Sequence, residues 1–200
     1  EDRLDLRGLQ VQLERYDRDV KQFRSAGRLT LEGLLQSGSA SELTLDLEEL
    51  DLLVFDGPEG MVSGRALIGG SLQQPDIRVA LQMETAELGR IQARLEGDEE
   101  GGRLQGSWTT PNADSLTVRG ELPWVWEQGQ IDYERGWLHL FSEGVSLSVF
   151  ANRMADLDHL DGLLSADLRV DGLGETMALD GHVGVENLAF ALLDVQPTYL

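Results

Sequence analysis

The stretch IRVALQM, residues 77–83, decides the fold class of this 200-residue chain. Apolar residues stand at positions 77, 79, 81 and 83, and Arg78, Ala80 and Gln82 stand between them. Alternation with a period of two is typical of a β-strand that has one apolar face and one solvated face. The same alternation recurs at 43–48, 91–95, 145–149 and 164–170. The sequence therefore predicts a mainly β protein.

Turn residues separate these runs at intervals of about ten to fifteen residues, as expected for a β-meander. Examples are the pairs Gly-Pro at 57–58, Gly-Gly at 69–70, Gly-Asp at 97–98, Gly-Gly at 101–102 and Pro-Asn at 111–112. One stretch departs from the alternation. Met154, Leu157 and Leu160 lie at helical spacing, which predicts one short helix near residues 152–161.

Weak internal repeats divide the chain into two units of hairpins, at about 25–95 and 115–195, within a single elongated segment spanning 1–200. Strands with one apolar face fit either a packed sandwich or a long sheet curled into a trough. Only 6 % of the residues are aromatic, and the inward positions are mostly aliphatic or Gly, which favours the trough. About 14 strands at roughly 4.8 Å each would extend on the order of 65 Å.

The charge and composition exclude several classes of function. The chain has 16 Lys and Arg against 36 Asp and Glu, a net charge of −20, so we expect no nucleic-acid partner and no docking along an anionic membrane surface. There is no Cys, and no apolar run is long enough for a transmembrane helix. Because the first residue is Glu1, we interpret the sequence as part of a longer protein.

No motif predicts catalysis, a metal site or a cofactor site. His139, His159 and His182 lack the spacing of metal ligands, and the acidic run at 156–162 lacks two ligand positions of a calcium loop. No phosphate-binding loop is possible because Lys21 is the only Lys. We therefore expect no enzyme activity, no catalytic residue, no metal and no cofactor.

Aromatic residues cluster once, from Trp124 to Phe141. The cluster fits either a surface on which a ligand stacks or rings that fill the sheet at a bend, and the second interpretation is favoured.

Four blocks combine glycines with alternating apolar residues: SAGRLTLEG at 25–33, MVSGRALIGGSLQQPDI at 61–77, RGELPW at 119–124, and LDGLLSADLRVDG at 160–172 followed by GHV at 181–183. These blocks resemble the TamB family of translocation and assembly module subunits of Gram-negative bacteria, within the AsmA-like superfamily.

The resemblance implies an all-β, mostly antiparallel sheet curled into an elongated trough, called a β-taco, with an apolar interior. It also implies a periplasmic protein anchored in the inner membrane, with an outer-membrane barrel partner of the TamA type. The implied function is a conduit that carries phospholipid between the two membranes and supports outer-membrane biogenesis. The alternative is a periplasmic chaperone or assembly module that holds outer-membrane β-barrel or autotransporter segments by strand addition.

A set of inward aliphatic residues is expected to line the trough and to contact phospholipid acyl chains. The set is Leu29, Leu31, Leu43, Leu45, Leu47, Ile77, Val79, Leu81, Met83, Val145, Leu147, Val149, Leu168, Val170, Val183 and Val185.

Overall fold

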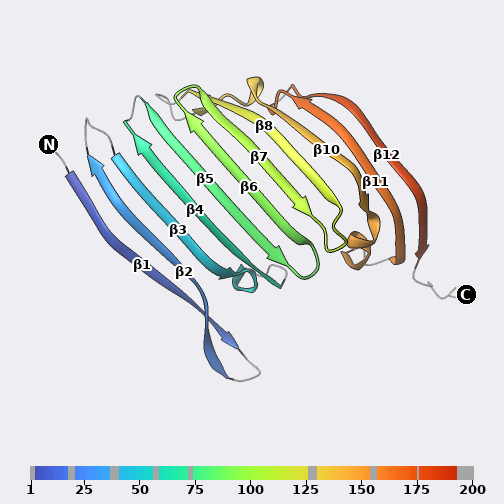
Figure 1. The fold of residues 1–200 in the computed structure, drawn as a ribbon, viewed down its shortest axis with the longest axis horizontal. Helices are drawn as coiled ribbons and strands as arrows, with labels where there is room; N and C mark the ends of the chain where they lie inside the picture. Colours follow the sequence, from blue (N-terminus) through green and yellow to red (C-terminus); the bar gives the residue numbers. More distant parts are fainter. Residues whose placement is uncertain are drawn as a thin grey trace, which may run out of the picture.

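The computed structural model describes residues 3–17, 21–36, 41–55, 59–71, 74–125, 130–153, 157–174 and 176–192. Strands dominate these residues, and three 3₁₀ helices accompany them (Figure 1). The strands are β1 (Arg3–Asp17), β2 (Gln22–Gln36), β3 (Ser41–Asp51), β4 (Gly60–Gly70), β5 (Pro75–Thr85), β6 (Gly89–Asp98), β7 (Gly101–Thr109), β8 (Ser115–Val125), β9 (Gln130–Ile131), β10 (Trp137–Ser146), β11 (Leu157–Asp171) and β12 (Ala178–Leu192). The helices are η1 (Leu52–Phe55), η3 (Tyr133–Arg135) and η4 (Leu147–Arg153).

All twelve strands belong to one antiparallel sheet, and their spatial order follows the chain from β1 to β8 and then from β10 to β12. The short strand β9 pairs with β8 beside this path. The prediction of an all-β, antiparallel, curled sheet is confirmed; the described residues contain twelve strands, and about fourteen were expected. The ten spacings between the eleven strands of the path, at about 4.8 Å each, extend the sheet over roughly 48 Å.

The hairpin between β6 and β7 shows how a turn sequence fixes the register. Asp98 pairs with Gly101, so only two residues lie between the strands. Gly101 has φ of +149°, and the Asp98 carboxylate accepts a hydrogen bond of 2.9 Å from the amide of Glu100. A side chain that bonds to the backbone two residues ahead stabilises such a turn. The predicted turn at 97–102 is confirmed.

The predicted helix at 152–161 is wrong in its position. The helix η4 covers Leu147–Arg153, and β11 begins at Leu157; residues 154–156 lie outside the described residues. Leu157 pairs with Leu192 and His159 pairs with Ala191, so β11 carries one extra residue here, a β-bulge. A bulge places residues three apart on the same face of a strand. This is why Leu157 and Leu160 imitate helical spacing.

The predicted strand at 145–149 ends earlier than expected, because β10 stops at Ser146. The side chain of Asp114 accepts a hydrogen bond from the Ser146 amide, and the Ser146 hydroxyl accepts one from the Ser148 amide. These side chains satisfy backbone donors that would otherwise need a neighbouring strand, so the chain turns into η4. Leu147 and Val149 therefore lie in a helix and not in a strand.

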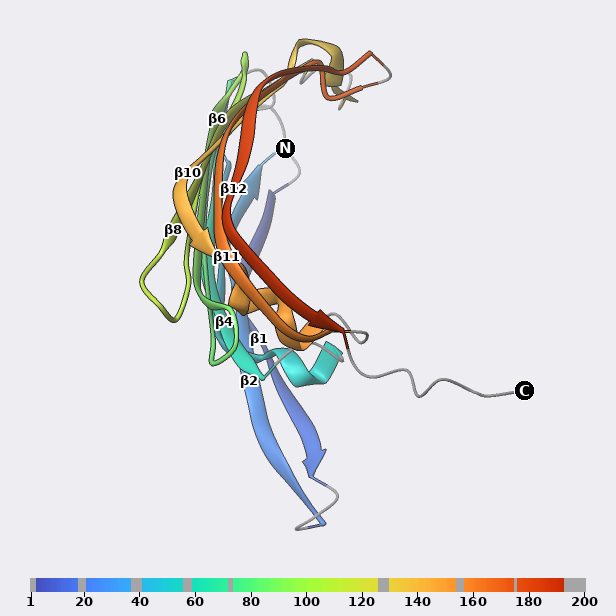
Figure 2. The same ribbon diagram turned by 90° about the vertical axis from the view of Figure 1, so that its right-hand side faces the viewer.

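The sheet is a single bowed layer. Figure 2 shows that η1 and η4 lie on its concave side. Among the described residues, no helix has both the length and the apolar character needed to cross a bilayer.

Candidate functional site

The strand register aligns apolar residues and glycines in rows that run across the sheet. One row is Leu9, Leu31, Leu45, Ala66, Val79, Leu95, Leu104, Gly120, Leu138, Val170 and Leu179. The next row is Val11, Leu29, Leu47, Gly64, Leu81, Ala93, Gly106, Val118, Leu140, Leu168 and Gly181. Neither row contains a polar or charged residue. The surface formed by these rows is called the apolar face below.

The apolar face lies on the concave side of the sheet. Phe150 of η4 packs edge to face against Trp108, with the ring centroids 5.7 Å apart. Trp108 stands two residues after Gly106 in β7 and therefore points to the same face. Because η4 lies on the concave side (Figure 2), the two rows line the concave side of the sheet.

Little covers the apolar face. Leu81 is 45 % exposed in the middle of the sheet, and Val183 and Leu179 near its edge are 55 % and 69 % exposed. The chain exposes 14199 Å² in all, about one and a half times the roughly 9,300 Å² expected for a compact monomer of 200 residues. A second layer of side chains that would turn this sheet into a packed sandwich is absent from the described residues.

At two positions of the apolar face, glycine leaves space for a leucine side chain of the neighbouring strand. A Cβ atom on Gly64 would lie 2.5 Å from Cδ2 of Leu81 and 2.7 Å from the carbonyl oxygen of Ala80. A Cβ atom on Gly120 would likewise collide with Leu138 and with the backbone of Trp137. The leucines of β5 and β10 therefore lie flat over the glycines of the neighbouring strands.

Most of the residues predicted to line a trough share this face. They are Leu29, Leu31, Leu43, Leu45, Leu47, Ile77, Val79, Leu81, Met83, Leu168, Val170, Val183 and Val185. Val145 points to the same face, since it pairs with Leu164, but it is completely buried and packs as core.

Leu147 and Val149 lie apart from the strand rows. A Cβ atom on Gly162 would stand 3.3 Å from Cδ1 of Leu147, which places Leu147 of η4 against β11. These two residues belong to the helix that packs on one end of the sheet.

Sequence reasoning missed the centre of the apolar face, where the strands β7, β8 and β10 contribute Leu104, Val118, Leu138 and Leu140. Glycines interrupt the alternation of apolar residues in β7 and β8. If glycine is counted as an inward residue, then 102–108 and 116–122 alternate as regularly as 77–83. That pattern would have identified these strands as part of the same face.

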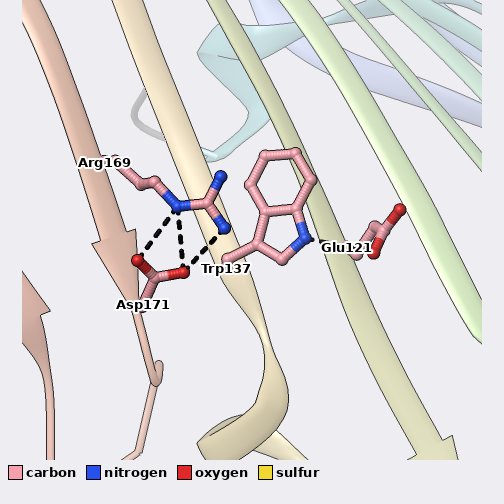
Figure 3. Close-up of polar contacts among 4 residues, drawn as sticks. All are labelled: Glu121, Trp137, Arg169 and Asp171. Atoms are coloured by element: carbon pink, nitrogen blue, oxygen red, sulfur yellow. Dashed lines mark hydrogen bonds and ion pairs between the residues drawn. The ribbon is translucent and has the colours of Figure 1, made fainter.

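Trp137 of the aromatic cluster lies on the convex face. Trp137 pairs with Glu121 and Asp171 on the convex face, and its indole nitrogen donates a hydrogen bond of 3.1 Å to the Glu121 carboxylate. The guanidinium of Arg169 lies 4.7 Å from the ring centroid (Figure 3). The side chains of Trp124 and Tyr133, and all of Trp126, lie outside the described residues. Trp137 therefore adds nothing to the concave side, and the interpretation that the cluster fills the sheet at a bend stays a prediction.

The convex face carries ion pairs within strands, such as Arg169 with Asp171 in β11, and between strands. The hydrogen bond from Arg169 lowers the pKa of the Asp171 carboxyl below its usual value of 3.8, and the same bond raises the pKa of Arg169. Arg65 and Asp46 form a similar pair between β3 and β4. Arg65, Arg169 and Asp171 are exposed and Asp46 is partly exposed, so each pair contributes little to stability.

The strand register brings together two histidines that are far apart in the sequence. His139 and His182 line one hollow of about 310 Å³, together with Asp167, Arg169 and Asp180. Nε2 of His139 lies 2.7 Å from the Asp167 carboxylate. No group of three or more His, Asp or Glu side chains in the described part of the chain has a geometry that could hold a metal ion.

No protein-family model, no curated protein and no solved structure matches this chain, so the resemblance of its sequence to the TamB family stays a prediction.

Proposed function

We propose that this chain forms a segment of a conduit in which the apolar face carries the acyl chains of phospholipid. The observation that supports the proposal is the uncovered apolar face, which runs without a charged side chain from β1 to β12. Apolar surface of this extent on a soluble protein marks a binding site.

The energetics fit a sliding ligand. Burying a methylene group stabilises it by about 0.8 kcal/mol, so a dozen methylenes on the face gain roughly 10 kcal/mol. Because successive strands present similar aliphatic side chains and glycines, neighbouring positions of an acyl chain differ little in energy. A lipid therefore binds without being held at one strand.

The sequence resemblance supports a proposal for the cellular location, which is the periplasm of a Gram-negative cell. The full-length protein would be anchored in the inner membrane, and its partner in the outer membrane would be a TamA-like barrel. Transport between the two membranes would then support outer-membrane biogenesis.

Photocrosslinking tests the proposal in cells. A photoreactive residue at position 81 should label phospholipid, whereas one at position 82 should not, since Leu81 and Gln82 point to opposite faces. Lipids copurifying with the chain are identified by mass spectrometry. Equal labelling at the two positions, or labelling of neither by lipid, would contradict the proposal.

A charge variant provides the second arm. Leu81→Arg places a guanidinium in the middle of the apolar face, where contact with an acyl chain would desolvate it, so we expect the copurified lipid to fall at least severalfold. Gln82→Arg adds the same charge to the convex face and should retain the lipid. Both positions are exposed, and thermal unfolding should show both variants to be folded.

The chaperone alternative is favoured by one feature, the strand β12, which has β11 as its only neighbour among the described strands. It is 15 residues long, and Leu179, Val183 and Phe190 along it are 69 %, 55 % and 58 % exposed. An edge of this kind can pair with an added strand. Crosslinks from β12 to peptide, in place of crosslinks from position 81 to lipid, would favour this function.

A further inference from the structure

On the convex face, one row of residues across the strands is basic, although the net charge of the whole chain is negative. It consists of Arg65, Ala80, Arg94, Gln105, Arg119, His139 and Arg169, on seven neighbouring strands from β4 to β11. No acidic residue interrupts the row, although the chain has more than twice as many acidic as basic residues. Asp46 precedes the row on β3, and Asp180 follows it on β12.

Acidic neighbours neutralise the two ends of this row. Arg65 pairs with Asp46, His139 lies against Asp167, and Arg169 pairs with Asp171. In the centre, Arg94 and Arg119 form no ion pair with any residue in the described ranges. The row therefore has two uncompensated guanidinium groups at its middle.

These two arginines line one hollow of about 330 Å³. The other side chains that line it are Gln92, Gln105, Ser107 and Thr117, and its floor is the backbone of β6, β7 and β8 at 93, 106 and 118. Each of the six side chains can donate a hydrogen bond, and none is a carboxylate. The lining of the hollow therefore offers six donor side chains and no negative charge.

The spacing between Arg94 and Arg119 suits a ligand that both guanidinium groups bind. Arg94 and Arg119 lie two strands apart, so their Cα atoms are separated by about 10 Å, with Gln105 between them. A guanidinium binds phosphate through two parallel hydrogen bonds. A phosphate group has enough oxygens to meet both forks and the Gln105 amide, whereas a carboxylate has only two.

The net charge of −20 does not prevent such binding. Screening at physiological ionic strength limits the interaction of exposed charges to about 8 Å, so the neighbours on the sheet determine the local field. Gln92, Ser107 and Thr117 on one side of the arginines are uncharged. The row on the other side is Glu96, Arg103 and Glu121, so three guanidinium groups face two carboxylates in this part of the convex face.

We propose that the hollow formed by Arg94, Gln105 and Arg119 is a binding site for a phosphate group. The group belongs either to a small phosphomonoester or free phosphate in solution, or to the headgroup of an anionic phospholipid in a membrane that faces the convex side. The inference is independent of the proposed function, because the hollow and the apolar face lie on opposite sides of the sheet.

Titration of the isotopically labelled chain with inorganic phosphate, followed by NMR at constant ionic strength, tests the site. We expect saturable shifts at the amides and side chains that line the hollow. Each of the variants Arg94→Gln and Arg119→Gln should weaken binding about tenfold, and the double variant should lose saturation. Acetate should bind more weakly than phosphate.

The matched control is the double variant Arg78→Gln with Arg90→Gln. It removes the same charge from the same face, but these arginines already pair with Asp76 and Glu84. It should retain the phosphate affinity. Absence of saturable shifts, or an equal loss in the control, would overturn the proposal.

Two further arms identify the source of the phosphate. Glycerol 3-phosphate is titrated in the same way, and cosedimentation is measured with vesicles of phosphatidylglycerol and of phosphatidylcholine. Vesicle binding that requires both arginines and phosphatidylglycerol assigns the site to a headgroup. Saturable binding of phosphate or glycerol 3-phosphate without vesicle binding assigns it to a soluble ligand.

Discussion

At the scale of single residues, the pair of Arg169 and Asp171 makes the clearest prediction about pH. The carboxyl of Asp171 has a lowered pKa because Arg169 bonds to its charged form. The pair therefore stabilises the folded chain above the usual pKa of 3.8, and this contribution disappears as the pH falls through the lower, folded value. The effect on stability is small, because both side chains are about half exposed.

An NMR titration of the Asp171 carboxyl checks this directly. The midpoint should lie below 3.8 in the natural chain and should rise toward 3.8 in Arg169→Gln. Arg65→Gln, on a distant strand of the same face, should leave the midpoint unchanged. A midpoint that does not respond to Arg169→Gln would show that the bond does not form in solution.

At the scale of strands and turns, the glycines of the apolar face are not equivalent. A Cβ atom on Gly64 would collide with Leu81 and with the backbone of Ala80, whereas a Cβ atom on Gly106 would meet nothing closer than the 3.4 Å to the carbonyl oxygen of Gln92. We expect Gly64→Ala to lower the free energy of unfolding by about 1–3 kcal/mol. Gly106→Ala should leave it unchanged or raise it by up to about 1 kcal/mol.

Denaturant unfolding of the two variants measures this difference. Equal effects of the two substitutions would show that Leu81 does not lie over Gly64. The variant Gly106→Phe then adds a functional readout, since a ring on the apolar face should reduce the copurified lipid without lowering stability as much as Gly64→Ala does.

The elements also show where sequence patterns are reliable. Regular strands such as β5 and β6 follow from alternation alone, because one register places their large apolar residues on the same side. The bulge in β11 could not be recognised, since only pairing with β12 distinguishes a bulged strand from a helix at 157–160. The face of the sheet on which Trp137 lies could not be predicted either, because the short strand β9 and the helix η3 interrupt the alternation before β10.

The two candidate sites also differ in how far the sequence alone predicts them. The aliphatic members of the apolar face could be predicted from one strand at a time, but the hollow between Arg94 and Arg119 could not. The two residues are 25 positions apart in the sequence, and only the register of β6, β7 and β8 places them in one row.

At the scale of the whole molecule, a single-layer sheet predicts a gradient of stability. An inner strand such as β6 is hydrogen-bonded on both sides, whereas β1 and β12 are bonded to one neighbour each in the described sheet. We expect native-state hydrogen exchange to be slowest in β5–β8 and at least about tenfold faster at the amides of β1 and β12 that point away from the sheet. Uniform protection from β1 to β12 would contradict this and indicate that the edges are covered.

The order of the strands also affects how the chain is made. Since β2 to β8 each pair with the strand that precedes them, every new strand finds its partner already in place as the polypeptide emerges. No strand pairs with a strand that is distant in the sequence. Pairing therefore closes only short loops, and the entropic cost of closing them stays low. The sheet can grow in one direction during synthesis, and in the described sheet only β1 and the newest strand then have an edge open to wrong partners.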